Sequence, residues 1–254
     1  MKKIGFIFLF FLLMTGCTQQ EKKITSKDFE ESFKITKIIE HHKNSFTEGF
    51  WIEDQFFYES AGKYGESLFY QWSESGEIEK KKEWDSNIFL EGSTSYQNHI
   101  YILTYKENKG YQLSKETWEI EKEYDYPREG WGLTTDGEYL IASDGSTNLY
   151  FLDKELKEKK VLKVTENGNE IKNINELEYI HDKIWANIWL ENTIVIINPK
   201  TGEVEEKYNF DSLIEKYLKE ETIDWMNGIA YDKKNNKIWI TGKYWPYMFE
   251  LERK

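Results

Sequence analysis

The fold is decided by Phe46-Thr47-Glu48-Gly49-Phe50, the first copy of a short motif that returns about every forty to fifty residues. A strand-like run, a turn and a second strand-like run follow each copy. A repeat of this period with all-β content is typical of a β-propeller, in which each copy makes one blade. The later copies are Leu90-Glu91-Gly92-Ser93-Thr94, Glu129-Gly130-Trp131-Gly132-Leu133-Thr134, Asn175-Glu176-Leu177-Glu178-Tyr179 and Trp225-Met226-Asn227-Gly228-Ile229-Ala230.

Five copies of the motif predict an all-β, five-bladed β-propeller. Matching positions of successive blades converge on one central axis. The polar residues that change from copy to copy, Glu48, Glu91, Asn175 and Asn227, are therefore expected to meet there. The expected blades span residues 46–84, 88–124, 130–164, 175–208 and 227–251.

Three local features are expected within this pattern. Lys109-Gly110 reads as a turn between two strands. Apolar residues at helical spacing predict a short helix over residues 211–221, with Asp211 or Ser212 capping its start. Alternation over residues 33–39 predicts a strand that closes the ring by joining the last blade.

The N-terminal segment has the pattern of an export signal rather than of a folded element. Lys2 and Lys3 precede a short apolar run that is too short to cross a bilayer as a mature helix. Met14-Thr15-Gly16-Cys17 then resembles a bacterial lipobox. We therefore expect a lipid on Cys17 and an extracytoplasmic protein anchored to a bacterial membrane. The expected organisation is a signal peptide over 1–16, a polar tether over 17–32 and the propeller over 33–254.

The composition excludes several classes of function. A net charge of −12 argues against binding to nucleic acid, or to an anionic membrane by charge alone. Cys17 is the only cysteine, so the mature chain is expected to contain no disulfide and to owe its stability to its core. Adjacent His41 and His42 point to opposite sides of an extended segment and make a poor metal site. No heptad or exposed amphipathic helix is evident, so a monomer is expected.

Eight stretches give the chain a recognisable family resemblance. In their order and spread over the whole mature domain, they resemble the plant and bacterial glutaminyl cyclases (glutamine cyclotransferases). The resemblance implies a five-bladed propeller that converts N-terminal glutamine of peptides or proteins to pyroglutamate, with release of ammonia and no cofactor needed for catalysis. The stretches are residues 42–49, 58–67, 129–134, 143–146, 174–179, 184–189, 227–232 and 241–246.

The chain departs from the family pattern at three places. It has Glu48 where the family usually has glutamine, Leu90 in place of the first glycine of Gly-Glu-Gly, and Tyr105 where a tryptophan is common. Glu48 and Tyr105 match positions that are expected to line the pocket. These departures bear on rate and substrate preference more than on the type of reaction.

The resemblance assigns catalytic roles to three residues. Glu91 is the expected general base and proton shuttle, because a carboxylate beside aromatic walls has its pKa raised toward neutrality. Lys243, after a tight turn, is expected to stabilise the oxyanion or orient the γ-carbonyl. Asn175 is expected to orient the amide and the amine. The alternatives are a surface glutamate, an exposed lysine and a turn asparagine.

The remaining expected site residues form the walls and floor of the pocket. Trp131 and Trp189 would enclose the methylenes of the glutamine and exclude water, with inter-blade packing as the alternative. Phe46, Glu48 and Tyr105 would complete the substrate-binding surface. The tryptophans assigned to the core are Trp185, Trp225 and Trp239.

Two other functions stay open from the sequence. One is a non-catalytic propeller that binds a peptide or glycan at its central face, since the fold alone does not decide function. The other is a lactonase-like hydrolase, with Glu48, Glu91, Asn175 and Asn227 as oxygen ligands of an axial calcium. A structural calcium is compatible with the cyclase interpretation as well.

Overall fold

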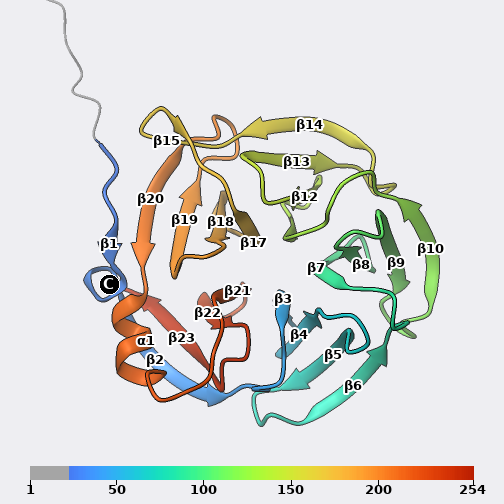
Figure 1. The fold of residues 1–254 in the computed structure, drawn as a ribbon, viewed down its shortest axis with the longest axis horizontal. Helices are drawn as coiled ribbons and strands as arrows, with labels where there is room; N and C mark the ends of the chain where they lie inside the picture. The colour runs from blue at the N-terminus through green and yellow to red at the C-terminus, as the bar shows by residue number, and fades with distance from the viewer. Residues whose placement is uncertain (1–22) are drawn as a thin grey trace, which may run out of the picture.

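Five antiparallel sheets surround a central axis in the computed structural model, which describes residues 23–254 (Figure 1). This arrangement confirms the predicted all-β, five-bladed propeller. The expected signal peptide over 1–16 and the lipidated Cys17 lie outside the described residues. None of the helices in residues 23–254 has the length and apolar character needed to span a membrane.

Each blade contains four antiparallel strands, ordered from the axis outward. Blade 1 contains β3 (Thr47–Glu53), β4 (Phe56–Ala61), β5 (Leu68–Ser73) and β6 (Ile78–Glu83). Blade 2 contains β7 (Leu90–Tyr96), β8 (His99–Thr104), β9 (Lys109–Ser114) and β10 (Ile120–Asp125). Blade 3 contains β11 (Leu133–Thr135), β12 (Leu140–Ser143), β13 (Asn148–Leu152) and β14 (Glu158–Lys163).

The last two blades also take up the N-terminal segment. Blade 4 contains β17 (Ile174–Ile180), β18 (Lys183–Ile188), β19 (Thr193–Ile197) and β20 (Val204–Asn209), with β1 (Lys27–Asp28) at its outer edge. Blade 5 contains β21 (Met226–Asp232), β22 (Lys237–Gly242), β23 (Tyr247–Arg253) and β2 (Phe33–Glu40). The small hairpin of β15 (Thr165–Glu166) and β16 (Asn169–Glu170) precedes blade 4, and α1 (Asp211–Tyr217) precedes blade 5.

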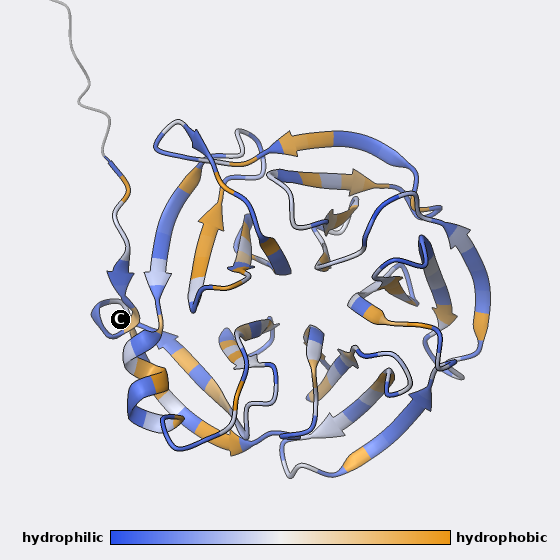
Figure 2. Cartoon of the chain, in the orientation of Figure 1, coloured by the Kyte–Doolittle hydropathy of each residue, from blue (hydrophilic) through white to orange (hydrophobic). Residues whose placement is uncertain are grey.

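The blades are held together by apolar side chains packed between neighbouring sheets. Inner and middle strands carry large buried residues, whereas outer strands such as β6, with sequence Ile-Glu-Lys-Lys-Lys-Glu, are mostly exposed (Figure 2). Charged outer strands protect the free sheet edges from pairing with other chains. Between blades 1 and 2, for example, Trp51 and Tyr58 of blade 1, which stack on each other with ring centroids 3.9 Å apart, share one core cluster with Ile100 of blade 2. Trp185 and Trp239 are buried as expected, whereas Trp225 is only partly buried.

Two local expectations are wrong. Lys109-Gly110 is not a turn but the start of β9. The glycine reflects close packing, because Leu156 from the next blade occupies the space where a side chain at Gly110 would be, with its Cδ1 only 2.1 Å from an added Cβ. The expected helix exists but is shorter, and neither Asp211 nor Ser212 caps it. Phe210 holds the capping position without a side-chain bond.

The ordered domain begins inside the segment expected to be a tether. β1 pairs in parallel with β20, and the 3-10 helix η1 (Phe29–Glu31) follows it directly. Phe29 is only 1% exposed and stacks on Phe210 with ring centroids 5.2 Å apart. The domain boundary expected at residue 33 therefore lies too late, since one buried aromatic fixes the preceding chain to blade 4.

The ring is closed by the strand that the sequence predicts. β2 pairs antiparallel with β23, so the last blade combines three C-terminal strands with one N-terminal strand. The chain then leaves β2 at His41, crosses to blade 1 and begins β3. Blades 1 and 5 are therefore joined covalently by this short crossing segment.

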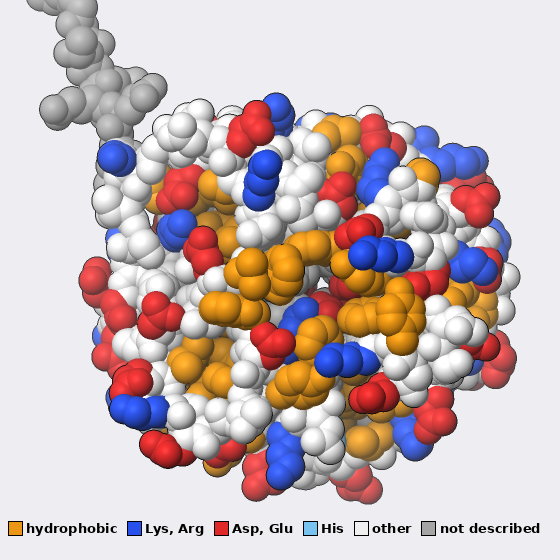
Figure 3. Space-filling view, viewed as in Figure 1, with side chains coloured by type: hydrophobic (Ala, Val, Ile, Leu, Met, Phe, Trp, Pro, Cys, Tyr) orange, Lys and Arg blue, Asp and Glu red, His pale blue; other side chains and the backbone are white. Residues whose placement is uncertain are grey.

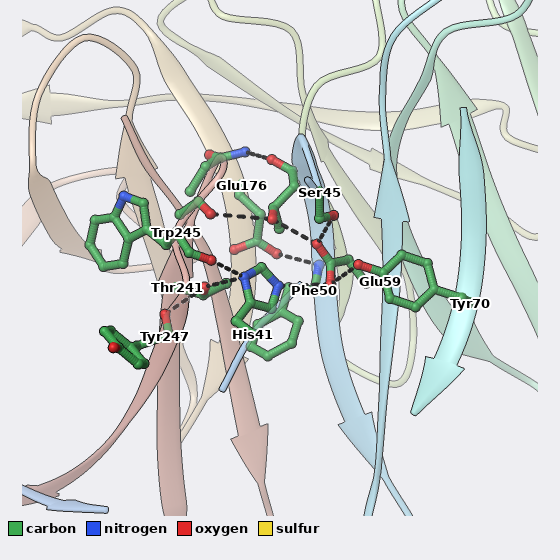
Figure 4. Close-up of polar contacts among 12 residues, drawn as sticks. His41, Ser45, Phe50, Glu59, Tyr70, Glu176, Thr241, Trp245 and Tyr247 are labelled. Carbon is green, nitrogen blue, oxygen red and sulfur yellow. Dashed lines mark hydrogen bonds and ion pairs between the residues drawn. The ribbon is translucent and has the colours of Figure 1, made fainter. Parts of the chain in front are cut away.

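A buried polar network reinforces this junction (Figure 4). The His41 Nε2 lies 3.0 Å from a carboxylate oxygen of Glu59 on β4, and its Nδ1 lies 2.8 Å from the Trp245 carbonyl oxygen beyond β22. Glu59 also accepts hydrogen bonds from the hydroxyls of Ser45, Thr47 and Tyr70. One carboxylate thus connects the crossing segment to both blades.

The network holds a charged pair in the protein interior. Burial lowers the pKa of His41, but the charge and hydrogen bond of Glu59 outweigh it and raise the pKa above the usual 6.5. Burial raises the pKa of Glu59, but His41 and the hydroxyl donors outweigh it and lower the pKa to about 2. Both ring nitrogens of His41 face acceptors, which also favours the doubly protonated imidazolium.

Glu59→Gln should therefore lower the free energy of unfolding by about 3 kcal/mol, because it leaves a buried imidazole without its counter-charge. Tyr70→Phe removes one hydrogen bond to the same carboxylate and should cost about 1 kcal/mol. Urea unfolding followed by tryptophan fluorescence measures both. Equal losses for the two variants would contradict a charged pair.

The loss caused by Glu59→Gln should also depend on pH. A raised His41 pKa stabilises the fold below 6.5, and this stabilisation is lost as pH rises through the folded-state value. A lowered Glu59 pKa stabilises the fold above 4.5, and this is lost as pH falls toward about 2. The difference between parent and variant should be greatest between these limits and shrink on either side.

Candidate active site

A cavity of about 500 Å³ opens at the axis on the face where the inner strands begin. Figure 3 shows hydrophobic side chains gathered around a hollow near the centre of the ring. All eight residues that the sequence analysis proposed for the site line this cavity, and three others join them. The lining residues are Phe46, Glu48, Lys63, Tyr64, Phe89, Glu91, Tyr105, Trp131, Asn175, Trp189 and Lys243.

The polar residues converge because they occupy the same place in four blades. Glu48, Glu91, Asn175 and Asn227 are each the second residue of their inner strand, β3, β7, β17 or β21. In every one of these strands the register with the next strand slips at that residue. Such a β-bulge turns a side chain away from the regular alternation. The repeated bulge therefore directs four polar side chains toward the axis.

Glycines at the motif let the inner strands approach one another closely. A Cβ on Gly92 would lie 2.4 Å from the backbone nitrogen of Leu133, and a Cβ on Gly132 would lie 2.1 Å from the carbonyl oxygen of Asn175. Neither position has room for a side chain. The recurring glycine of the motif is thus explained by the narrow axis, which also brings residues of different blades within bonding distance.

The floor of the cavity holds a buried ion pair. The Lys243 Nζ lies 2.6 Å from Glu48 Oε1, and their side chains are only 6% and 3% exposed. The Asn227 amide donates to the second oxygen of Glu48 at 3.2 Å and to the Thr47 carbonyl at 2.9 Å. Lys243 also lies over the ring of Phe46, 4.2 Å from its centroid. Glu48, one of the departures from the family pattern, is therefore a structural partner of the expected catalytic lysine.

Glu91 lies beside this pair in the lining of the cavity, close enough to Glu48 for the two carboxyl groups to interact. Burial and the neighbouring Glu48 charge raise the pKa of Glu91 well above its usual value, while Lys243 opposes the shift. Burial also raises the pKa of Glu48, against the attraction of Lys243. Because Lys243 contacts Glu48 directly, the carboxylate charge resides on Glu48 and the proton on Glu91. The site thus holds a proton on Glu91 to a higher pH than an isolated glutamate would.

Aromatic side chains enclose the polar floor. Trp131 and Trp189 meet at right angles with ring centroids 5.4 Å apart, and the Trp131 Nε1 donates to Glu129 at 3.2 Å. Trp131 lies over Gly145, where an added Cβ would come within 2.6 Å of the indole. On the opposite side, Phe89 contacts the Tyr105 ring. An apolar wall of this kind excludes water and strengthens the electrostatic interactions inside it.

Asn175 presents an unused acceptor to the cavity. The Ser143 hydroxyl donates to its backbone carbonyl at 2.7 Å and fixes the main chain. Within the described part of the chain, no donor reaches its buried Oδ1. A buried acceptor without a partner is costly, so this oxygen is available to a ligand group that carries N–H.

The sequence analysis did not select Lys63, Tyr64 or Phe89 for the site. A signal for the first two was present, because Gly62-Lys63-Tyr64 repeats Gly242-Lys243-Tyr244. Both tripeptides lie at the end of the second strand of a blade: Gly62 directly follows β4, and Gly242 is the last residue of β22. Phe89 precedes the Glu91 motif directly and carried no signal of its own.

The axial residues are not arranged as a calcium site. Glu48 is paired with Lys243, and the raised pKa of Glu91 disfavours its carboxylate form, so neither side chain is well suited to bind calcium. In residues 23–254, no three His, Cys, Asp or Glu side chains gather in a metal-binding arrangement.

The fold and the site define a five-bladed propeller whose axis carries two carboxyl groups, an ammonium group and an aromatic enclosure. The chain belongs to the glutamine cyclotransferase family, whose model matches residues 8–252. It is 30% identical over 266 residues to a glutaminyl-peptide cyclotransferase of Arabidopsis thaliana, covering 98% of this chain and 80% of the relative. The crystal structure of Myxococcus xanthus glutaminyl cyclase superposes with a TM-score of 0.82 at 30% identity, covering 87% of this chain and 96% of the other.

The proton on Glu91 can be tested directly. Infrared titration at neutral pH should show a protonated carboxyl band in the parent that is absent from Glu91→Gln. In Glu48→Gln the same band should disappear at lower pH, because removal of the like charge lowers the pKa of Glu91. Glu178, whose pKa burial raises to about 8, remains in all three proteins and serves as an internal reference. A parent spectrum identical to that of Glu91→Gln would contradict the assignment.

Proposed function

We propose that this chain is a glutaminyl-peptide cyclotransferase that converts the N-terminal glutamine of peptides or proteins to pyroglutamate and releases ammonia. The observation that carries the proposal is the convergence of Glu91 and the buried Glu48–Lys243 pair inside one aromatic enclosure. Membership of the glutamine cyclotransferase family supports the reaction type. The activity belongs to the aminoacyl-type acyltransferases, because the γ-acyl group passes from one nitrogen to another.

The first requirement of the reaction is geometric. The nucleophilic α-amine and the electrophilic γ-carbon belong to one glutamine, so the pocket has only to fold the side chain back on itself. Trp131 and Trp189 form one wall for the methylene groups, and Phe46, Phe89 and Tyr105 form another. Holding two reacting groups in such a near-attack arrangement removes much of the entropic barrier.

The second requirement is the movement of one proton. The α-amine attacks the γ-carbon, the new C–N bond forms, and the old bond to the amide nitrogen breaks. Overall, one proton leaves the attacking nitrogen and one reaches the departing nitrogen. Glu91 can donate its proton to the departing nitrogen and take one from the attacking nitrogen, so that it ends the cycle as it began.

The third requirement is control of charge at the γ-oxygen. Lys243 provides an ammonium group that is already desolvated and oriented by Glu48, at no cost of reorganisation. The free Oδ1 of Asn175 is an acceptor for the N–H of the substrate amine. Since proton transfer and charge stabilisation come from the chain itself, we propose that catalysis needs no metal or cofactor.

The cellular setting remains a proposal from the sequence. We propose a monomeric, extracytoplasmic enzyme held at a bacterial membrane by a lipid on Cys17, which lies outside the described residues. β1 and η1 would then place the end of the tether at the outer edge of blade 4.

The soluble domain starting after Cys17 should release ammonia from glutamine-initiated dipeptides, as measured with a coupled ammonia assay. Glu91→Gln should lower kcat by about 10²- to 10⁴-fold, the usual contribution of a positioned acid–base group. Tyr217→Phe on α1, remote from the cavity, is a matched control and should retain parental turnover. No release by the folded parent from several glutaminyl peptides would favour the non-catalytic, peptide- or glycan-binding propeller.

The pH dependence of kcat should reveal the two carboxyl groups. Glu48 raises the pKa of Glu91, and Glu91 begins the proposed cycle protonated, so the parent should keep its activity to a higher pH on the alkaline side than Glu48→Gln. We expect the alkaline limb of the variant to move down by about one pH unit. The comparison uses kcat because it reports ionisations in the enzyme–substrate complex. Superimposable profiles would contradict coupling between the two carboxyl groups.

A further inference from the structure

Lys63 is an ammonium group at the edge of the active-site cavity that the proposed chemistry does not use. Its Nζ lies 4.6 Å from the ring centroid of Phe46 and 5.3 Å from that of Tyr244. Within residues 23–254 it forms no ion pair, although Glu66 lies on the same loop and contributes to its electrostatic environment. Phe46 is therefore contacted by two lysines, Lys243 at the floor and Lys63 at the rim.

The backbone of Lys63 is strained. Its φ is +108°, in a region that side chains other than glycine rarely adopt. Strain of this kind costs on the order of 1–3 kcal/mol and persists where the surrounding structure imposes it, often at functional sites. Here the loop between β4 and β5 presents Lys63 and then the half-exposed Tyr64 toward the cavity. The loop thus places a cation at the rim against its backbone preference.

A second cavity, of about 590 Å³, adjoins the active site at this point. It shares Phe46 and Lys63 with the active-site cavity. From there it extends between the crossing segment, residues 40–46, and the loop after β4, as far as Ile78 on the outer strand β6. The two cavities therefore meet at Phe46 and Lys63, which form the junction between the axial cavity and one that reaches the outer strand β6.

We propose that this second cavity is a subsite for the peptide residues that follow the N-terminal glutamine, and that Lys63 makes it prefer a carboxylate close behind the glutamine. The inference rests on the proposed function, because it assumes that glutamine occupies the axial cavity. A peptide extends by about 3.3–3.6 Å per residue, so the second or third residue of a bound peptide reaches the junction.

The charges around the subsite support a selective but modest preference. Lys43 and Lys63 line it as cations, and Glu40 and Glu66 line it as anions, so the outer groove has no strong net sign. Of these four charged residues, only Lys63 also lines the axial cavity. A chain with a net charge of −12 repels an acidic substrate, and the attraction of the local Lys63 ammonium group compensates for this repulsion at the subsite.

The test compares two isosteric peptides, Gln-Glu-Ala-amide and Gln-Gln-Ala-amide, in the full soluble domain. At low salt the parent should favour the acidic peptide by about five- to tenfold in kcat/KM, mainly through KM. Lys63→Gln should reduce this ratio to within about twofold, and Lys63→Glu should invert it. The parental preference should also weaken as salt screens the rim.

Lys106→Gln is the matched control. Lys106 also lies over an aromatic ring, 4.5 Å from the Tyr105 centroid, but lines neither cavity. This variant loses the same charge and should keep the parental ratio. A further pair, Gln-Ala with a free carboxylate and Gln-Ala-amide, separates recognition of a chain terminus from recognition of an acidic side chain.

The outcomes separate this inference from the proposed function. Turnover of both tripeptides at equal efficiency, or the same ratio in parent and Lys63→Gln, overturns the subsite and leaves the cyclase intact. An equal fall in Lys106→Gln overturns a local role for Lys63 and assigns the preference to the overall field. No turnover of any peptide overturns the proposed function and the subsite with it.

Discussion

The junction between the first and last blades is the constraint on which the site depends. Glu59 and His41 bind together the segment that leads into β3 and the turn that follows β22, and these two segments carry Glu48 and Lys243. Thr47, the neighbour of Glu48, donates to Glu59, and the backbone nitrogen of Tyr244, the neighbour of Lys243, donates to the Ser45 carbonyl at 2.8 Å. The closure of the ring and the position of the Glu48–Lys243 ion pair therefore depend on the same buried carboxylate, that of Glu59.

A propeller suits this chemistry because its symmetry is approximate. The bulge near the start of β3, β7, β17 and β21 directs a side chain to the axis in each blade, whereas the third blade contributes Trp131 from the segment before β11. Identical backbones thus deliver different groups: two carboxyls, two amides and an indole. Packing them around one narrow axis keeps them dry, and in that setting the like charges of Glu48 and Glu91 cannot both ionise easily. The departure at Glu48 consequently places a second carboxyl group beside Glu91, where its charge contributes to the raised pKa of Glu91.

The two Gly-Lys-Tyr turns illustrate how position alters the use of one sequence. Lys243 is buried against Glu48, whereas Lys63 lies at the rim and forms no ion pair with a carboxylate among residues 23–254. Both turns hold a residue other than glycine at positive φ, Tyr244 in one and Lys63 in the other. In our proposals, the same Gly-Lys-Tyr turn therefore places Lys243 at the axis, where it stabilises negative charge, and Lys63 at the rim, where it selects the peptide that binds.

The sequence by itself determined the number of blades, the closing strand and the group of residues at the axis. Each of these depends on a repeated motif or on the alternation of apolar and polar residues, and both patterns are visible in one sequence. It also favoured a raised pKa for Glu91, for which burial is the largest cause and the charge of Glu48 the next. Only the tertiary structure decided that Glu48 pairs with Lys243, that Phe29 fixes the chain before residue 33, and that Lys63 joins the cavity. These depend on distances between segments of different blades, and local sequence carries no measure of such distances until the ring is closed.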